Sequence, residues 1–188
     1  MKVDIEAALF SDIEPLPVPK VDLGTLAISD PSGKATTALA WSNLDANQFE
    51  RLLFDLFKNF STFQNVQWLT KTNAPDKGRD LSAEWVLDDG TGGVRTERVI
   101  IQAKHWLSQS VGVAELSANL AYTKLWEPPK VQALIIATSG HFSVDAIQWA
   151  EKHNGEGVAP RIDLWPQSRL EFLLAQKPHL MAEHLPRK

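Results

Sequence analysis

Two polar side chains end a strongly apolar stretch near the middle of the sequence. The run VIIQAK, residues 99–104, starts as a buried strand and finishes with an amide at Gln102 and an ammonium at Lys104. Because side chains alternate along a strand, Gln102 and Lys104 are expected on the same face. The pattern predicts that this strand leaves the core at its end and presents both groups to a site.

A carboxylate is expected beside this pair. Asp80 stands at the head of the preceding strand, and the turn-forming segment DDGTGG, residues 88–93, separates the two strands. Antiparallel pairing through such a turn brings the start of one strand next to the end of the other. The spacing therefore predicts that Asp80 lies beside Gln102 and Lys104.

These residue types suit a hard divalent ion. The Asp80 carboxylate, the Gln102 amide oxygen and the backbone carbonyl of Ala103 are oxygen ligands, which Mg²⁺ or Mn²⁺ prefers and zinc does not. Glu50, on an earlier helix, is expected to hold the outer side of the same ion through water. Lys104 would orient an attacking water or neutralise charge at phosphorus, so the set predicts metal-assisted phosphodiester hydrolysis.

The surrounding segments must position these groups. Asp45 is expected to cap a helix whose apolar residues recur at helical spacing from Phe49 to Phe60. Further along, the patterns predict strands at residues 66–69, 79–87, 98–105, 133–138 and 162–165. They predict helices at residues 111–125, 142–153 and 166–175. An antiparallel meander followed by α/β crossovers implies an α/β fold with a mixed central sheet flanked by helices.

The first forty residues differ from the rest. Prolines recur at positions 15, 17 and 19. Residues 24–28 are compatible with a short strand, and the segment DPSG that follows is predicted to form a turn. We expect residues 1–40 to form an arm or small addition, and residues 41–188 to form one domain.

Composition narrows the class of protein. Hydrophobic residues make up 44% and charged residues 22% of the 188-residue chain, as in a typical soluble globular protein. The net charge of −4 means that any binding to DNA must come from a local basic patch. No apolar run is long enough to cross a membrane, and the chain has no cysteine, so we expect a cytoplasmic protein without disulfides.

Taken together, the motifs resemble those of the PD-(D/E)XK nuclease superfamily, and the glutamine variant is similar to the Mrr-like restriction endonucleases. The matching phrases are FERLLFDLF with Glu50, KGRDLSAEW with Asp80, and VIIQAKHW with Gln102 and Lys104. The downstream phrases ALIIATSGHFSVDAIQWAEKH and IDLWPQSRLEFLL also resemble that family, so the resemblance covers residues 43–178. Arg79 departs from it, since an aliphatic residue is usual there.

The resemblance implies a restriction-endonuclease-like core and an Mg²⁺-dependent endonuclease acting on double-stranded DNA in restriction or antiviral defence. It also implies that two copies act together as a homodimer. The acidic net charge and the lack of a recognisable target-recognition domain favour a further alternative, in which a partner or sensor protein activates or targets the nuclease. Lys77, Arg79 and His105 are candidate DNA contacts. The alternative function is a catalytically silent module with a nuclease fold that binds DNA or a protein partner.

Simpler interpretations remain for several of these residues. Glu50 could pair with Arg51 or Lys58 on the surface of its helix, and Gln102 and Lys104 could lie on an exposed edge strand. Other assignments also remain open: Asp76 as the acid in place of Asp80, Glu84 as a further member of the cluster, His141 at the entry to a helix, and Thr138 and Ser139 as phosphate ligands or helix caps.

Overall fold

The computed structural model describes residues 39–69 and 80–185. The chain divides into two units, Met1–Thr37 and Ala38–Lys188, and the described residues belong to the second unit. The predicted strand at 24–28 and nearly all of the predicted N-terminal arm lie outside the described residues, as do Asp76, Lys77 and Arg79.

The elements follow the predicted order of one helix, three strands and then alternating helices and strands. Their bounds are η1 Trp41–Asn43, α3 Ala46–Lys58, β1 Phe63–Trp68, β2 Leu81–Asp88, β3 Val94–Lys104, α4 Val113–Thr123, η2 Lys124–Trp126, β4 Ala133–Thr138, α5 Val144–Gly155, β5 Arg161–Trp165, α6 Gln167–Ala175 and α7 Pro178–His184. Asp45 caps α3 as predicted, since its carboxylate accepts the backbone N–H of Gln48 at 2.8 Å.

Several elements differ from the prediction; strand β3, for example, begins at Val94 and not at residue 98. Strand β1 starts at Phe63 and not at Val66, because an irregularity between Gln64 and Gln67, with Asn65 at a φ of 50°, breaks the alternation on which the prediction rested. Helix α7 was not predicted, since its seven residues are too few to show a helical period.

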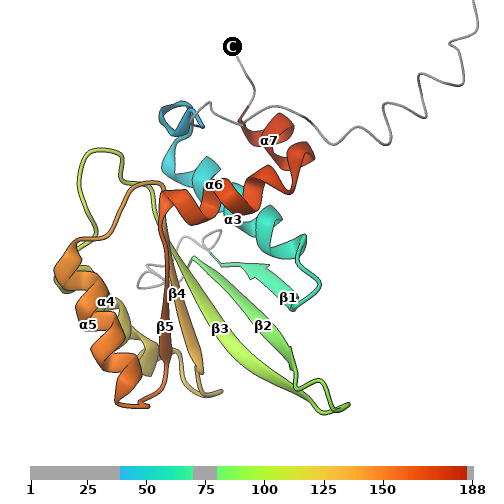
Figure 1. The fold of residues 1–188 in the computed structure, drawn as a ribbon, viewed down its shortest axis with the longest axis vertical. Helices are drawn as coiled ribbons and strands as arrows, with labels where there is room; N and C mark the ends of the chain where they lie inside the picture. Colours follow the sequence, from blue (N-terminus) through green and yellow to red (C-terminus); the bar gives the residue numbers. More distant parts are fainter. Residues whose placement is uncertain (1–38, 70–79, 186–188) are drawn as a thin grey trace, which may run out of the picture. The chain divides into compact units, whose positions relative to one another are not determined.

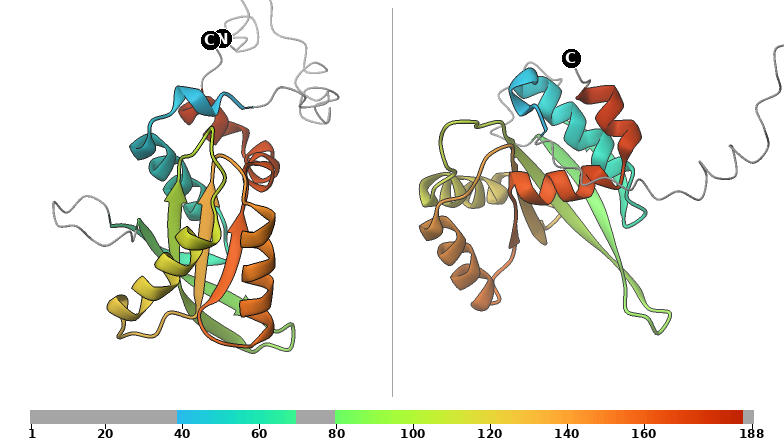
Figure 2. Two further views of the ribbon diagram at one scale, coloured as in Figure 1. Left: turned by 90° about the vertical axis from the view of Figure 1, so that its left-hand side faces the viewer. Right: turned by 45° about the horizontal axis from the view of Figure 1, so that its top comes forward.

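The strands form one five-stranded mixed sheet in the order β1-β2-β3-β4-β5. Neighbours β1–β2 and β2–β3 are antiparallel, whereas β3–β4 and β4–β5 are parallel. Helices α3, α6 and α7 cover one face of the sheet, and α4 and α5 cover the other, as Figures 1 and 2 show. The predicted α/β fold with a mixed sheet flanked by helices is confirmed.

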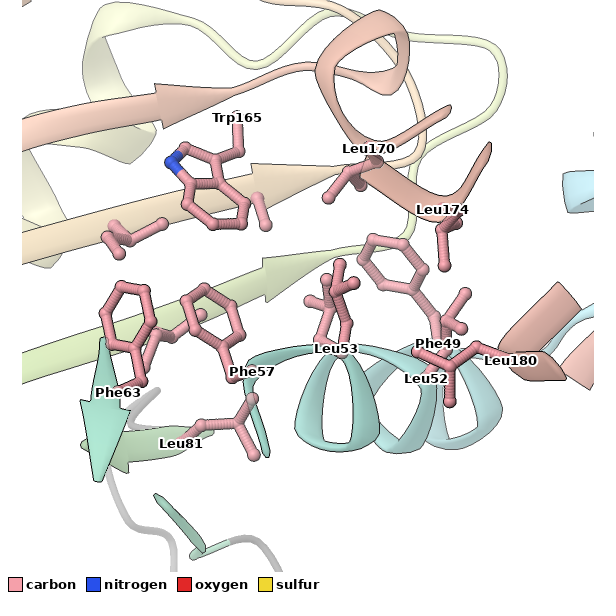
Figure 3. Close-up of a cluster of buried hydrophobic side chains, with 14 of the residues drawn as sticks. Phe49, Leu52, Leu53, Phe57, Phe63, Leu81, Trp165, Leu170, Leu174 and Leu180 are labelled. Atoms are coloured by element: carbon pink, nitrogen blue, oxygen red, sulfur yellow. The ribbon is translucent and has the colours of Figure 1, made fainter. Parts of the chain in front are cut away.

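The larger core lies between the sheet and α3 (Figure 3). The Phe57 ring stacks on Trp165 of β5 with a centroid distance of 4.8 Å, and Phe49 and Leu53 are almost fully buried in the same cluster. The second core joins Ile100 and its neighbours on β4 to α4 and α5. Strands β3 and β4 are therefore buried on both faces, which explains their nearly continuous apolar sequences. Among the described residues, no helix has the length and apolar character needed to cross a lipid bilayer.

Candidate active site

The Asp80 and Gln102 side chains meet at one end of the sheet. In the register of β2 and β3, Leu81 lies opposite Ile101, so Asp80, one residue before β2, lies beside Gln102. The Gln102 side-chain Nε2 donates a hydrogen bond to Asp80 Oδ2 at 2.6 Å. The two residues are only 7% and 2% exposed, so this polar contact is made almost out of reach of solvent.

A second donor fixes the same carboxylate oxygen. The backbone N–H of Ala103 donates to Asp80 Oδ2, also at 2.6 Å. The Asp80 carbonyl in turn accepts the N–H of Leu69 at 2.9 Å, which ties the start of β2 to the end of β1. Backbone groups on both sides thus hold Asp80 in place. Ala103 contacts Asp80 through its amide; its carbonyl as a metal ligand remains a prediction.

The Gln102 amide has one oxygen left over. The amide nitrogen donates to the Asp80 carboxylate, so the amide oxygen Oε1 does not take part in that bond. This buried oxygen has no hydrogen-bond partner. Leaving a buried polar atom unpaired costs about 1–3 kcal/mol. A cation coordinated by this oxygen would remove that cost, and the amide and carboxylate oxygens at this position fit a hard divalent ion such as Mg²⁺ or Mn²⁺.

Lys104 lies on the same face of β3 as Gln102. Ile100 belongs to the core under α4 and α5, and alternation puts Gln102 and Lys104 on that side. Lys104 is half-buried and lies beside Thr138, the last residue of β4. Strand β3 is internal and Gln102 is buried, so the alternative of an exposed edge strand is wrong.

Glu50 reaches the same end of the sheet from the opposite face. Its Oε2 accepts a hydrogen bond from Trp68 Nε1 at 3.2 Å, and the Trp68 ring packs against the core on the α3 side. The simpler interpretation, in which Glu50 forms a surface ion pair with Arg51 or Lys58, is wrong. Arg51 is paired with Asp55, and the Lys58 ammonium lies 5.1 Å from the centroid of the Phe54 ring.

His105 has partners within the protein. Its Nε2 lies 2.8 Å from the carbonyl oxygen of Leu44, and its ring packs on Phe49 at a centroid distance of 5.3 Å. These contacts join the end of β3 to the start of α3, so they explain His105 without a role in DNA binding. The other two candidate DNA contacts, Lys77 and Arg79, lie outside the described residues.

The sequence left open whether Thr138 and Ser139, in the turn after β4, cap the next helix. Thr138 and Ser139 do not cap α5; the cap is Ser143, whose hydroxyl accepts the N–H of Ala146 at 3.2 Å. Ser139 is 1% exposed, and its hydroxyl has no hydrogen-bond partner. Its backbone N–H donates to the Lys104 carbonyl at 3.3 Å, so the turn after β4 is held against the end of β3. A phosphate-binding role for Thr138 or Ser139 remains a prediction.

Glu84 is held away from the Asp80 cluster. Its carboxylate accepts a hydrogen bond from Asn65 Nδ2 at 2.7 Å, on the exposed part of β1 and β2. A hollow of about 390 Å³ runs along this part of the sheet, and its lining includes the two basic residues Arg98 and Lys130. The Arg98 guanidinium is anchored to the carbonyl oxygens of Trp126 and Pro129, which leaves Lys130 as the exposed basic side chain of the hollow.

Comparison with known proteins identifies the family of this chain. The model of a restriction endonuclease family, the Mrr catalytic domain, matches residues 41–174, which is more than half of the 188-residue chain. The match runs from η1 into α6 and includes the residues at the end of β3. No curated protein and no solved structure matches the chain.

Proposed function

The chain belongs to this Mrr-type restriction endonuclease family, and from that membership we propose that it is a divalent-metal-dependent endonuclease that hydrolyses phosphodiester bonds in double-stranded DNA. One observation carries the proposal. The bond between Asp80 and Gln102 leaves the Gln102 Oε1 atom buried and unpaired, two residues before Lys104 on the same face of β3.

Four residues would hold the ion. Asp80, Gln102 and the carbonyl of Ala103 supply oxygen ligands, and Glu50 contributes through water from the α3 side. Mg²⁺ or Mn²⁺ suits such a set, because both ions accept oxygen ligands and retain bound water. When bound, the ion would supply positive charge for the phosphate and lower the pKa of water.

Lys104 supplies the other positive charge. Its half-buried side chain, two residues after the buried Gln102 on the same face of β3, would act where water is partly excluded, and so its effect on a phosphate oxygen would be greater than on an exposed surface. Lys104 would hold the scissile phosphate or the attacking water. Asp80 would keep its orientation through the two donors that fix its Oδ2 atom.

We further propose that the protein is the effector nuclease of a restriction or antiviral defence system in the cytoplasm. Cutting both strands requires two such sites, which a homodimer would provide. A partner or sensor protein that targets or activates the nuclease is the other route, and the net charge of −4 supports it, because a negatively charged chain has little affinity of its own for DNA.

A plasmid-cleavage assay tests the proposal. Supercoiled plasmid is incubated with wild type, Asp80→Asn, Lys104→Ala and the surface control Lys152→Ala, each with Mg²⁺, Mn²⁺ or EDTA. We expect cleavage by wild type and Lys152→Ala with either ion and none in EDTA. Asp80→Asn and Lys104→Ala should lose at least about 100-fold in rate. Circular dichroism should show that all four proteins are folded.

Two outcomes would contradict the proposal. The first is undiminished cleavage by folded Asp80→Asn or Lys104→Ala, which would exclude these residues from the chemistry. The second is a folded wild-type protein that binds DNA but cuts under none of the conditions, alone or with lysate from its host, which would favour the silent binding module.

A further inference from the structure

Helices α3 and α7 meet at a second cluster of ligand-type side chains, separate from the site at the end of β3. Asp55 of α3 lies close to Glu183 and His184 of α7, and one ligand atom from each of the three residues lies within 4.8 Å of the others. In residues 39–69 and 80–185, this is the one set of three histidine or acidic side chains arranged so closely.

The His184 imidazole is buried and incompletely satisfied. Its side chain is 7% exposed, and Nε2 lies 3.0 Å from Asp55 Oδ2. This contact is not a hydrogen bond, and the buried Nε2 atom has no other hydrogen-bond partner. A ring nitrogen and a carboxylate oxygen that face each other without a hydrogen bond are placed as two ligands of one ion would be.

The remaining positions around the cluster are accessible. Glu183 is exposed and its side chain can swing inward, and a hollow of about 240 Å³ borders Glu183 and His184. Arg51 lies 3.9 Å from Asp55 Oδ2, but its side chain is 59% exposed, so it can leave the carboxylate at little cost. The hollow therefore has room for a water molecule as a fourth ligand.

We propose that Asp55, Glu183 and His184 bind a divalent transition-metal ion of the zinc class and thereby fasten α7 to α3. Imidazole nitrogen with two carboxylates favours Zn²⁺, whereas the oxygen-only set at Asp80 favours Mg²⁺. Ligand atoms around tetrahedral zinc are about 3.3 Å apart, so the Glu183 carboxylate must close in by roughly 1–2 Å.

The position of α7 gives such an ion a structural consequence. Leu180 of α7 is buried in the core that also contains Leu52 of α3 (Figure 3). His179 makes a second link between the two helices, with Nε2 3.1 Å from Asn59 Oδ1. A metal ion bound by α3 and α7 stabilises the folded state because the unfolded chain has no preformed site.

Thermal unfolding of the metal-free full-length protein tests this inference. We expect Zn²⁺ to raise the Tm by about 5 °C when its concentration is well above the dissociation constant. The rise should persist in Asp80→Asn, which removes the proposed catalytic ion site, and in His179→Gln, which alters the other histidine between α7 and α3. It should be lost in Glu183→Gln and in His184→Gln.

A calorimetric titration of Asp80→Asn with Zn²⁺ should give one ion per chain, and Glu183→Gln in the same background should remove that binding. Glu183 is exposed, so this variant is expected to fold even if His184→Gln is not. The inference is overturned if Zn²⁺ does not raise the Tm of the wild type, or if the rise survives in Glu183→Gln. Asp55 and His184 would then be an ordinary pair between two helices. Since the measurement is stability and metal binding, its result is independent of DNA cleavage.

Discussion

At the scale of single residues, Gln102 departs most clearly from ordinary core packing. A core strand that only filled space would carry an apolar side chain at this position, as it does at Ile100 two residues earlier. The amide instead donates to Asp80 and leaves a buried oxygen unpaired. A buried polar atom without a partner lowers the stability of the fold, so its presence at the end of a buried strand points to a bound group that contacts the oxygen.

The variant Gln102→Glu tests the site at this scale. It places a second carboxylate against Asp80 Oδ2, where the amide nitrogen now donates at 2.6 Å. Two buried carboxylates in contact are unfavourable unless a cation lies between them, so we expect a loss of about 1–3 kcal/mol in EDTA. Saturating Mg²⁺ should restore most of this loss.

The measurement is the Tm of wild type, Gln102→Glu and Gln102→Leu with Mg²⁺ or EDTA. Gln102→Leu lacks both amide atoms, so its Tm should depend on Mg²⁺ less than that of the wild type. If Gln102→Glu responded to Mg²⁺ no more than the wild type does, Gln102 would not be a neighbour of the ion.

At the scale of elements, the turn between β4 and α5 locks the end of β3. Gly140 passes so close to the Trp106 carbonyl oxygen that a Cβ atom at position 140 would collide with it. This is a backbone contact that cannot move aside without shifting the segment after Lys104. The glycine therefore allows the close approach that positions the end of β3.

We expect Gly140→Ala to destabilise the fold by about 1–3 kcal/mol, because the collision is with backbone and not with a flexible side chain. Gly155 is the matched control. It is the last residue of α5, and a Cβ there would meet nothing within 4 Å. Gly155→Ala should be neutral or stabilising by up to about 1 kcal/mol. Urea denaturation of both variants measures the difference, and equal effects would contradict it.

The β2–β3 hairpin has a pH-dependent turn. Hydrogen bonds from the Thr91 backbone N–H, from the Thr91 hydroxyl and from the Gly93 N–H lower the pKa of Asp89 below its ordinary value of 3.8. Because the pKa in the folded state is below that in the unfolded state, ionised Asp89 stabilises the fold above pH 3.8. This contribution disappears as the pH falls through the lowered pKa.

Asp89→Asn keeps an acceptor oxygen at this position but removes the charge. The Tm of the wild type should exceed that of Asp89→Asn near neutral pH, and the two values should converge as the pH falls through the lowered pKa of Asp89. A difference in Tm that stays constant from neutral pH down to the most acidic pH at which both proteins remain folded would show that the charge of Asp89 does not stabilise the turn.

At the scale of the whole molecule, the central sheet both supports the core and carries the predicted catalytic groups at one end. The internal strands β3 and β4, covered by helices on both faces, form a rigid base, and the predicted catalytic groups lie where β3 ends. The described part of the chain presents one such set of residues. If these residues are catalytic as proposed, one copy of the set would act on one DNA strand at a time.

Double-strand cleavage should therefore depend steeply on protein concentration if two copies act together. At low concentration we expect nicked plasmid to accumulate before linear plasmid, and at high concentration linear product should appear at once. Mixing wild type with an excess of Lys104→Ala should slow linearisation more than nicking, since mixed dimers cut one strand. If the fraction of linear product did not change with protein concentration, a dimer that forms on DNA would be contradicted.

The sequence by itself determined the order of the helices and strands from α3 to α6, the capping of α3 by Asp45 and the pairing of β2 with β3, because each follows from local periodicity or turn chemistry. The proximity of Asp80 and Gln102 followed from that pairing, since register depends on the turn between the strands. Only the tertiary structure decided that Glu50 binds Trp68, that His105 packs on Phe49 and that Asp55 meets His184. These contacts join residues on separate elements, and the angle at which helices pack on a sheet depends on the whole core, which no local pattern of residues records.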